Sequence, residues 1–186
     1  MSNVRPSEDI ILDACCLINL VVKSCMRDIL VALPANFVVS KYVYEREALY
    51  TLADPTTGER EKIDLNPLIS DGLLRIVDLM TEAETATFVD LTTKIEDGEA
   101  NTCALALHRG YVIATDERKV LNLIRNSMPS VQTRATTEII KMWADVTRVS
   151  NQRLRDVLMN VRSCARFAPN PQDPLHHWWH TVVGKP

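Results

Sequence analysis

Short apolar runs alternate with amphipathic segments along most of the chain. The runs at 9–14, 36–40, 73–77 and 111–115 have the length of β-strands and little polar interruption, which is typical of strands buried on both faces of a parallel sheet. A shorter run of the same kind lies at 131–133. Strands that alternate with helical segments indicate a doubly wound α/β domain.

Segments with helical periodicity lie between these runs. The clearest begins at 97–99 and places four apolar residues on one face at i, i+3, i+4 and i+7 spacing, after which Gly110 closes it. Ser40 is expected to cap the helix that begins near Lys41. The remaining helices of the domain are predicted at residues 17–30 (ended by Pro34), 82–93, 118–125 and 137–146.

Two polar stretches interrupt the pattern. Residues 54–61 include Pro55 and Gly58 and are predicted to form a loop, and residues 66–72 are predicted to form a turn region. The alternation of strands and helices otherwise continues without a linker between residues 9 and 146. The sequence therefore predicts one domain over this range.

The pattern changes after residue 150. Four apolar residues between 154 and 161 predict an amphipathic helix, and three prolines between 169 and 174 follow it. The segment 176–180 holds three histidines and the pair Trp178 and Trp179. It is expected to be extended, so that adjacent imidazoles point in opposite directions and do not favour a metal site. Residues 150–186 are predicted to be an extension that packs on the domain and buries at least one of these tryptophans.

Composition and charge restrict the function classes. The 186 residues include 46% hydrophobic and 24% charged residues, as in ordinary globular proteins, which excludes a disordered chain and a coiled-coil rod. Lys and Arg total 21 against 24 Asp and Glu, which gives a net charge of −3. Contact with a polyanion such as nucleic acid therefore requires a local basic patch or metal ions.

The apolar runs and the cysteines bear on localisation. No apolar run reaches the roughly 18 residues of a membrane-spanning helix, and no signal peptide is evident at the N-terminus. The five cysteines are odd in number, irregularly spaced and without a CxxC pair. This favours reduced core thiols over a disulfide framework. A cytoplasmic protein without a membrane partner is expected.

Several acidic residues are candidates for a metal-binding site. Asp13 ends the first strand and Asp116 ends the strand at 111–115, and the carboxyl ends of parallel strands meet at one edge of a sheet. Glu99 lies in the first turn of a helix that leads into the Asp116 strand, and either Glu45 or Glu47 could supply a fourth acid. Converging carboxylates repel one another unless a cation is present, and oxygen donors suit Mg²⁺ or Mn²⁺.

Four short motifs in this order resemble the PIN domain family, which includes VapC-type toxins and, more distantly, flap endonucleases. The resemblance covers roughly residues 9–146. The motifs are Ile11-Leu12-Asp13-Ala14-Cys15-Cys16-Leu17-Ile18, Arg46-Glu47-Ala48-Leu49-Tyr50, Asp97-Gly98-Glu99-Ala100 and Ala114-Thr115-Asp116-Glu117-Arg118. The resemblance implies a three-layer α/β/α domain with a central, mostly parallel sheet.

The resemblance also implies a site and an activity. It assigns catalysis to four acids and metal binding to three of them, in divalent metal-dependent hydrolysis of phosphodiesters, most readily those of RNA. Cys15 stands where the family often has Ser or Thr, so one hydroxyl is expected to be missing beside the first acid. The catalytic acids are Asp13, Glu47, Glu99 and Asp116; the metal ligands are Asp13, Glu99 and Asp116; Glu45 and Glu117 are auxiliary candidates.

Partners follow from the same resemblance. Arg118, Lys119 and Arg125 follow the last acid and are expected to contact phosphates, with Arg109 as a further candidate. VapC-like proteins usually dimerise, so a homodimer is expected, and a toxin role would imply an antitoxin protein. The alternative is a PIN-fold module that binds RNA or protein with weak or no catalysis.

Other function classes fit less well. A response-regulator receiver needs an acidic pair in the first strand, and a HAD-type phosphatase needs a second Asp at the position of Cys15. The sequence has no Walker loop and no GxGxxG motif, so it gives no support for a nucleotide cofactor.

Overall fold

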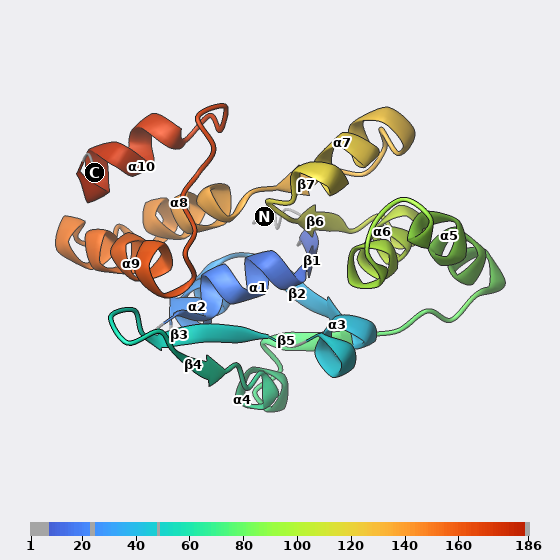
Figure 1. Cartoon of the computed structure of the whole chain (residues 1–186), viewed down its shortest axis with the longest axis horizontal. Helices are drawn as coiled ribbons and strands as arrows, with labels where there is room; N and C mark the ends of the chain where they lie inside the picture. The colour runs from blue at the N-terminus through green and yellow to red at the C-terminus, as the bar shows by residue number, and fades with distance from the viewer. Residues whose placement is uncertain (1–7, 23–24, 48, 185–186) are drawn as a thin grey trace, which may run out of the picture.

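A computed structural model describes residues 8–22, 25–47 and 49–184 and has a mixed α/β architecture. Its central sheet has five strands in the order β5-β2-β1-β6-β7, and all four pairings are parallel (Figure 1). The strands are β1 (Glu8–Leu12), β2 (Ala35–Ser40), β5 (Leu74–Val77), β6 (Val112–Ala114) and β7 (Thr133–Arg134). The predicted strands and the parallel sheet are confirmed, and the run expected at 131–133 contributes β7.

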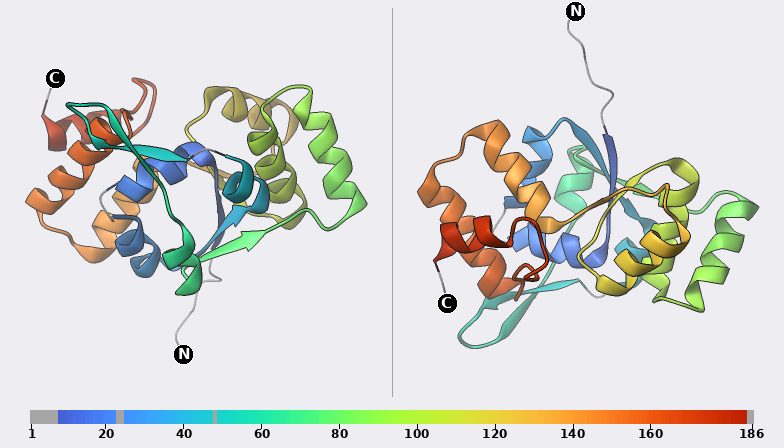
Figure 2. Two further views of the ribbon diagram at one scale, coloured as in Figure 1. Left: turned by 60° about the horizontal axis from the view of Figure 1, so that its bottom comes forward. Right: turned by 90° about the horizontal axis from the view of Figure 1, so that it is seen from above.

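Helices cover both faces of this sheet. Ile10 and Leu12 of β1 pack into one core together with α1, α2 and α8, whereas Ile11 packs into a second core with α6 and α7. Alternate residues of a strand point to opposite faces, so an unbroken apolar strand fits this arrangement. The arrangement is consistent with three α/β/α layers. Both views of Figure 2 place α8, α9 and α10 toward one end and α5, α6 and α7 toward the other.

The helices account for most of the remaining described chain. They are α1 (Ala14–Val21), α2 (Cys25–Ala32), α3 (Lys41–Arg46), α4 (Asn66–Ser70), α5 (Glu82–Thr92), α6 (Asp97–Arg109), α7 (Arg118–Ser127), α8 (Thr136–Thr147), α9 (Asn151–Cys164) and α10 (His176–Val183). Ser40 caps α3 as predicted, since its Oγ accepts from Val43 N at 3.1 Å. Gly110 ends α6 with a φ of 69°, in the left-handed region where glycine is favoured. No helix among these described segments is both long and apolar enough to cross a membrane.

The single helix predicted at residues 17–30 is wrong. The described chain forms α1, leaves the helical conformation at Val22 (φ −50°, ψ 122°) and begins α2 at Cys25. The thiol of Cys25 donates to the Leu20 carbonyl at 3.0 Å, which satisfies one carbonyl at the end of α1. The break carries no proline or glycine, so periodicity alone gave no signal for it.

The loop predicted at 54–61 is wrong in part. The turn is present, with Gly58 N bonded to Asp54 O at 2.9 Å, but it joins two strands of an antiparallel hairpin. These strands are β3 (Tyr50–Asp54) and β4 (Glu59–Lys62). Every residue of β4 is charged and exposed, so this strand lacks the apolar alternation that identifies a strand in a sequence. The turn region at 66–72 contains the short helix α4.

The C-terminal helices α9 and α10 pack on the sheet-bearing part of the chain. Trp179 is completely buried and meets the ring of Phe167 edge to face, with 5.7 Å between ring centroids. Apolar residues of α9 and α10 belong to the same core as α1, α2 and α8. The segment around the histidines is the helix α10 and not an extended chain, and it places the rings of His176 and His180 4.4 Å apart on one face.

A buried ion pair joins α5 to α6. Arg109 Nε donates to Glu84 Oε1 at 2.7 Å and Arg109 Nη2 donates to the Asp78 carbonyl at 2.6 Å. The Glu84 side chain is only 4% exposed. The hydrogen bond from Arg109, aided by the amides of Met80 and Thr81, lowers the pKa of Glu84 to about 2. Arg109 therefore has a structural partner, which does not fit the expected phosphate contact.

Replacing Arg109 by Ala is expected to destabilise the fold by about 3 kcal/mol, because a buried carboxylate loses its cation. The control Lys94→Ala removes an exposed ion pair with Asp90 and is expected to cost less than about 0.5 kcal/mol. Urea unfolding of both variants measures the difference. The stabilisation from Glu84 is complete above its ordinary pKa of 4.5 and is lost as the pH falls toward 2. Equal losses in the two variants at pH 7 would contradict the structural role.

Candidate functional site

The ends of β1 and β6 bring two acidic residues together. These strands are parallel neighbours with Leu12 opposite Ala114, and Asp13 N donates to the Ala114 carbonyl at 3.1 Å. Asp13 and Asp116 therefore lie at the same edge of the sheet, as the sequence predicted. This edge is formed by the carboxyl ends of the strands, where open α/β sheets place their ligands.

Asp13 is held rigidly at this edge. It is 4% exposed and caps α1, since its Oδ1 accepts from Ala14 N at 2.8 Å. Its Oδ2 accepts from Thr115 Oγ1 at 2.9 Å and lies 3.5 Å from the Cys15 thiol. The hydroxyl expected to be missing because of Cys15 is thus supplied by Thr115, which belongs to a different strand end.

Four carboxylates interact electrostatically through Asp13, and we call them the acid cluster: Asp13, Glu47, Glu99 and Glu117. Burial raises the pKa of Asp13, and the charge of Glu117 raises it further against the opposing hydrogen bonds. Burial also raises the pKa of Glu47 and of Glu99, and in both cases the charge of Asp13 adds to the effect. No Lys or Arg of the described segments forms an ion pair with a member of the cluster.

Glu47 reaches the cluster from the end of α3. It is the C-cap of that helix with an extended backbone, whereas the resemblance placed it on the helix. Its side chain lies against the first turn of α6, and a Cβ at Gly98 would overlap its Oε1. Glu45 is exposed on α3. The geometry thus favours Glu47 over Glu45, and Ala48 of the same motif lies outside the described residues.

Glu99 reaches the cluster from the first turn of α6. Its Oε2 accepts from Glu96 N at 3.1 Å, so it also closes the N-terminus of that helix. One turn later, Cys103 is buried, and burial followed by the charges of Asp13 and Glu99 raises the pKa of its thiol to about 12. Glu99 is thus a helix-start carboxylate, as its position in the first turn predicts, and its side chain also feels the charges of Asp13 and Glu117; it remains a predicted metal ligand.

Asp116 faces a different set of neighbours. Its Oδ1 accepts from Thr136 N at 3.0 Å, and its Oδ2 accepts from the Thr136 hydroxyl, from Asn19 Nδ2 at 3.1 Å and from Cys16 Sγ at 3.5 Å. Burial raises the pKa of Asp116, and these hydrogen bonds oppose the rise. The carboxylate therefore joins α1 to the start of α8, and it remains a predicted catalytic residue.

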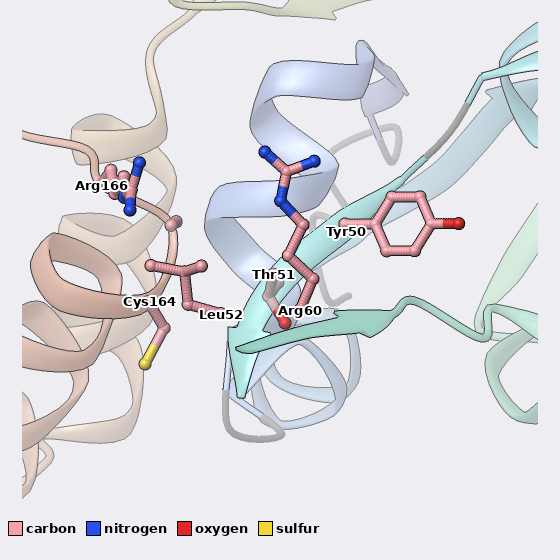
Figure 3. A pocket seen from close by; sticks show the side chains of 7 residues that line it. Tyr50, Thr51, Leu52, Arg60, Cys164 and Arg166 are labelled. Atoms are coloured by element: carbon pink, nitrogen blue, oxygen red, sulfur yellow. The ribbon is translucent and has the colours of Figure 1, made fainter. Parts of the chain in front are cut away.

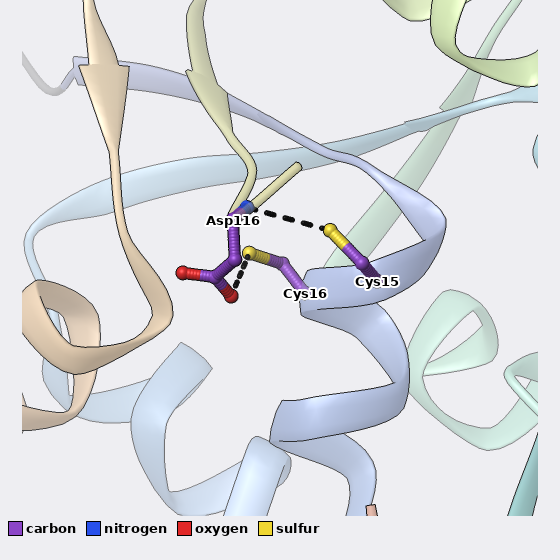
Figure 4. Close-up of side chains that lie close together, drawn as sticks. All are labelled: Cys15, Cys16 and Asp116. Carbon is purple, nitrogen blue, oxygen red and sulfur yellow. Dashed lines mark hydrogen bonds between the residues drawn. The ribbon is translucent and has the colours of Figure 1, made fainter. Parts of the chain in front are cut away.

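Two adjacent cysteines lie between these carboxylates. The thiol sulfurs of Cys15 and Cys16 and a carboxylate oxygen of Asp116 lie within 4.8 Å of one another, close enough to hold a metal ion (Figure 4). Among the residues that the structure describes, no other group of three His, Cys, Asp or Glu side chains meets this spacing. The expectation that the cysteines are core residues is confirmed for the buried Cys16, whereas Cys15 is only half-buried.

Polar neighbours of Asp116 were also missed. Asn19 and Thr136 are 5% and 0% exposed. A buried Asn one turn after Cys15 and Cys16 on an otherwise apolar helix is a usable signal in the sequence, since buried amides need hydrogen-bond partners. Thr136 gives no such signal, because only the fold places the start of α8 beside the end of β6.

Two groups of basic side chains bear on the expected phosphate contacts. Arg118, Lys119 and Arg125 are exposed on α7, and none of them forms an ion pair with a described residue. A separate pocket lies between the hairpin and the end of α9, and Arg60 and Arg166 line it (Figure 3). The pocket was not predicted from the sequence, because the hairpin that forms one of its walls was expected to be a loop.

Comparison with known proteins adds no family. No protein-family model matches the chain, and no curated protein matches it.

Replacing Asp13 by Asn is expected to raise the melting temperature of the metal-free protein by about 2–4 °C at pH 7. Burial makes the charged form unfavourable, and the amide keeps the size of the side chain and an oxygen for Ala14 N. Because folding raises the pKa of Asp13, its charge destabilises the wild-type protein at high pH. The stability gained by Asp13→Asn is therefore largest at high pH and disappears below the ordinary pKa of 3.8. Thermal unfolding in the presence of chelator measures it, and a lower melting temperature at pH 7 would contradict the electrostatic argument.

Proposed function

We propose that the protein is a divalent metal-dependent phosphodiester hydrolase that cleaves RNA, with a PIN-like domain. The observation that carries the proposal is the acid cluster at the carboxyl edge of a parallel sheet. Its carboxylates come from four separate places, the starts of α1, α6 and α7 and the end of α3. The charge of Asp13 raises the pKa of Glu47 and of Glu99, and the charge of Glu117 raises the pKa of Asp13 and of Glu99. None of the four has an ion-pair partner among the described residues. Carboxylates that converge without a cationic partner repel one another, and a bound divalent cation would relieve that repulsion.

The oxygen donors of the acid cluster are of the kind that Mg²⁺ and Mn²⁺ prefer, but no three of its carboxylates lie within 4.8 Å of one another in the described structure. All four members of the acid cluster offer carboxylate oxygens, which these hard ions prefer. Asp13 and Glu99 would hold the ion, Glu47 would lie on its α3 side, and the pair Asp116–Glu117 would supply the remaining acid. When bound, such an ion polarises the phosphate and lowers the pKa of a coordinated water.

The chain itself fixes the geometry of these ligands. Thr115 and Ala14 N orient the two oxygens of Asp13, and Glu96 N orients Glu99. Positioned ligands contribute to catalysis because misplacement by about 1 Å can cost about a hundredfold in rate. Gly98 leaves the space into which the Glu47 carboxylate extends.

The substrate proposal follows from charge. The whole chain carries a net charge of −3, so general attraction cannot hold a polyanion. The exposed cations of α7 begin directly after Glu117 and provide local phosphate contacts beside the acid cluster: Arg118, Lys119 and Arg125. Their contribution would be independent of sequence and sensitive to salt.

The decisive experiment compares wild type with Asp13→Asn, Glu99→Gln and Asp116→Asn on single-stranded RNA and single-stranded DNA. Each reaction is run with Mg²⁺, with Mn²⁺ and with chelator. We expect metal-dependent RNA cleavage that falls at least about a hundredfold in Asp13→Asn and Glu99→Gln. Asp156→Asn removes an exposed carboxylate on α9 and serves as the matched control.

The outcomes separate the alternatives. Cleavage that survives chelator, or that is equal in wild type and Asp13→Asn, rejects the metal-dependent mechanism. RNA binding without cleavage in any metal supports the alternative of a PIN-fold binding module. Preference for DNA keeps the mechanism and changes the substrate.

Replacing Gly98 by Ala tests the position of Glu47. The new Cβ would displace the Glu47 carboxylate, while alanine within a helix is favoured over glycine by up to about 1 kcal/mol. We expect unchanged or higher thermal stability together with about tenfold slower cleavage. Circular dichroism and the cleavage assay measure the two effects, and a variant that loses stability and activity in parallel would indicate a packing defect instead.

A further inference from the structure

The cysteine pair beside the acid cluster differs from the cluster in donor chemistry. Cys15 Sγ, Cys16 Sγ and Asp116 Oδ2 offer two sulfurs and one oxygen, and the two sulfurs come from adjacent residues at the start of α1 (Figure 4). Sulfur ligands select zinc-like ions over Mg²⁺ and Mn²⁺. We propose that these three atoms form a second metal site, which takes a thiophilic divalent ion of the Zn²⁺ class and lies directly beside the acid cluster.

The spacing of the ligand atoms fits a tetrahedral ion. Cys16 Sγ lies 3.5 Å from Asp116 Oδ2. A Zn–S bond of about 2.3 Å and a Zn–O bond of about 2.1 Å at a tetrahedral angle place sulfur and oxygen about 3.6 Å apart. Cys15 Sγ is within 4.8 Å of both other atoms, so all three ligand atoms already lie on one side of α1 within reach of a single ion.

Surrounding groups hold the oxygen ligand in place. Asp116 is fixed by Thr136 and by Asn19, as outer partners fix the ligands of known metal sites. Its hydrogen bonds all come from neutral groups, and it has no ion pair with a described residue. A half-buried carboxylate without a cation is a favourable neighbour for a divalent ion. The half-buried Cys15 leaves a side of the site toward which solvent can supply a fourth ligand.

The site is coupled to the acid cluster through Cys15. Its thiol donates to Asp13 Oδ2 at 3.5 Å, while its sulfur accepts from Asp116 N at 3.4 Å. An ion bound by Cys15 takes the place of the thiol proton, which leaves to solvent, so Asp13 loses that hydrogen bond. The ion also places positive charge beside the acid cluster. Occupancy of the cysteine site therefore weakens Mg²⁺ or Mn²⁺ binding at Asp13, a consequence that rests on the proposed function, whereas the binding site itself does not.

Cadmium is the probe for the site, because thiolate–Cd²⁺ bonds absorb in the ultraviolet. Titration of the metal-free full chain is expected to give this absorption with a stoichiometry of one ion per chain. Cys15→Ser and Cys16→Ser are expected to lose the absorption and to weaken binding by more than about a hundredfold. Cys164→Ser, a buried cysteine at the end of α9, is the matched control and is expected to bind as wild type does.

A second measurement needs no variant, in case Cys16→Ser does not fold. Zn²⁺ is expected to protect Cys15 in wild type from alkylation, as mapped by peptide mass spectrometry, while Mg²⁺ is not. Absorption that persists in both serine variants, or alkylation of Cys15 that Zn²⁺ does not slow, overturns the proposal.

Cleavage assays then separate this proposal from the function. If the protein is a nuclease, Zn²⁺ is expected to inhibit its Mn²⁺-dependent cleavage at least about tenfold in wild type and less than about twofold in Cys15→Ser. Cd²⁺ binding at the cysteines in a protein that cleaves nothing supports the site and rejects the nuclease. Cleavage in a protein without thiolate–Cd²⁺ absorption supports the nuclease and rejects the site.

Discussion

The parallel pairing of β1 with β6 is the constraint on which the rest of this molecule depends. The pairing sets Leu12 opposite Ala114 and continues as the bond from Asp13 N to the Ala114 carbonyl. The ends of β1 and β6, more than a hundred residues apart in the sequence, are thereby aligned at the same edge of the sheet. A shift of one residue would turn each side chain to the opposite face and separate Asp13 from Thr115.

The same edge gives its two aspartates different environments. Asp13 shares the negative field of Glu47, Glu99 and Glu117, whereas Asp116 is surrounded by neutral donors from α1 and α8. Burial raises the pKa of both carboxyls, but their neighbours favour different kinds of cation. A cluster of oxygens favours a hard cation, and a carboxylate beside two thiols favours a soft one. We thus propose two metal sites at one edge of the sheet, one for Mg²⁺ or Mn²⁺ and one for an ion of the Zn²⁺ class.

Elements away from this edge hold its parts in position. The ion pair between Arg109 and Glu84 fixes α6 against α5, and α6 carries both Gly98 and Glu99. On the other face, α9 and α10 extend the core that contains α1 and α8. The burial of Trp179 in that core makes the C-terminal segment part of the fold. The positions of α1, α6 and α8, and with them the ligand geometry, depend on this packing.

The sequence by itself determined the sheet and the placement of its acids. Unbroken apolar runs can only be buried on both faces, which requires a parallel sheet with helices on each side, and an acid after such a run must lie at the carboxyl edge. The placement of Asp13 and Asp116 at this edge followed directly, whereas Glu99 was expected to reach it from the first turn of the helix that leads into the strand of Asp116. The expectation that at least one of the two adjacent tryptophans is buried followed from the size of their apolar surface.

The tertiary structure alone decided which neighbours those acids have. The break between α1 and α2 and the charged strand β4 carry no periodic signal of their own, because packing against distant elements stabilises them. Contacts between Asp116 and Thr136, or between Glu47 and Gly98, join residues whose separation in the sequence says nothing of their distance. The orientation of each carboxylate, and therefore the cation it suits, is a property of the assembled edge, because hydrogen-bond partners and burial exist only once the chain has folded.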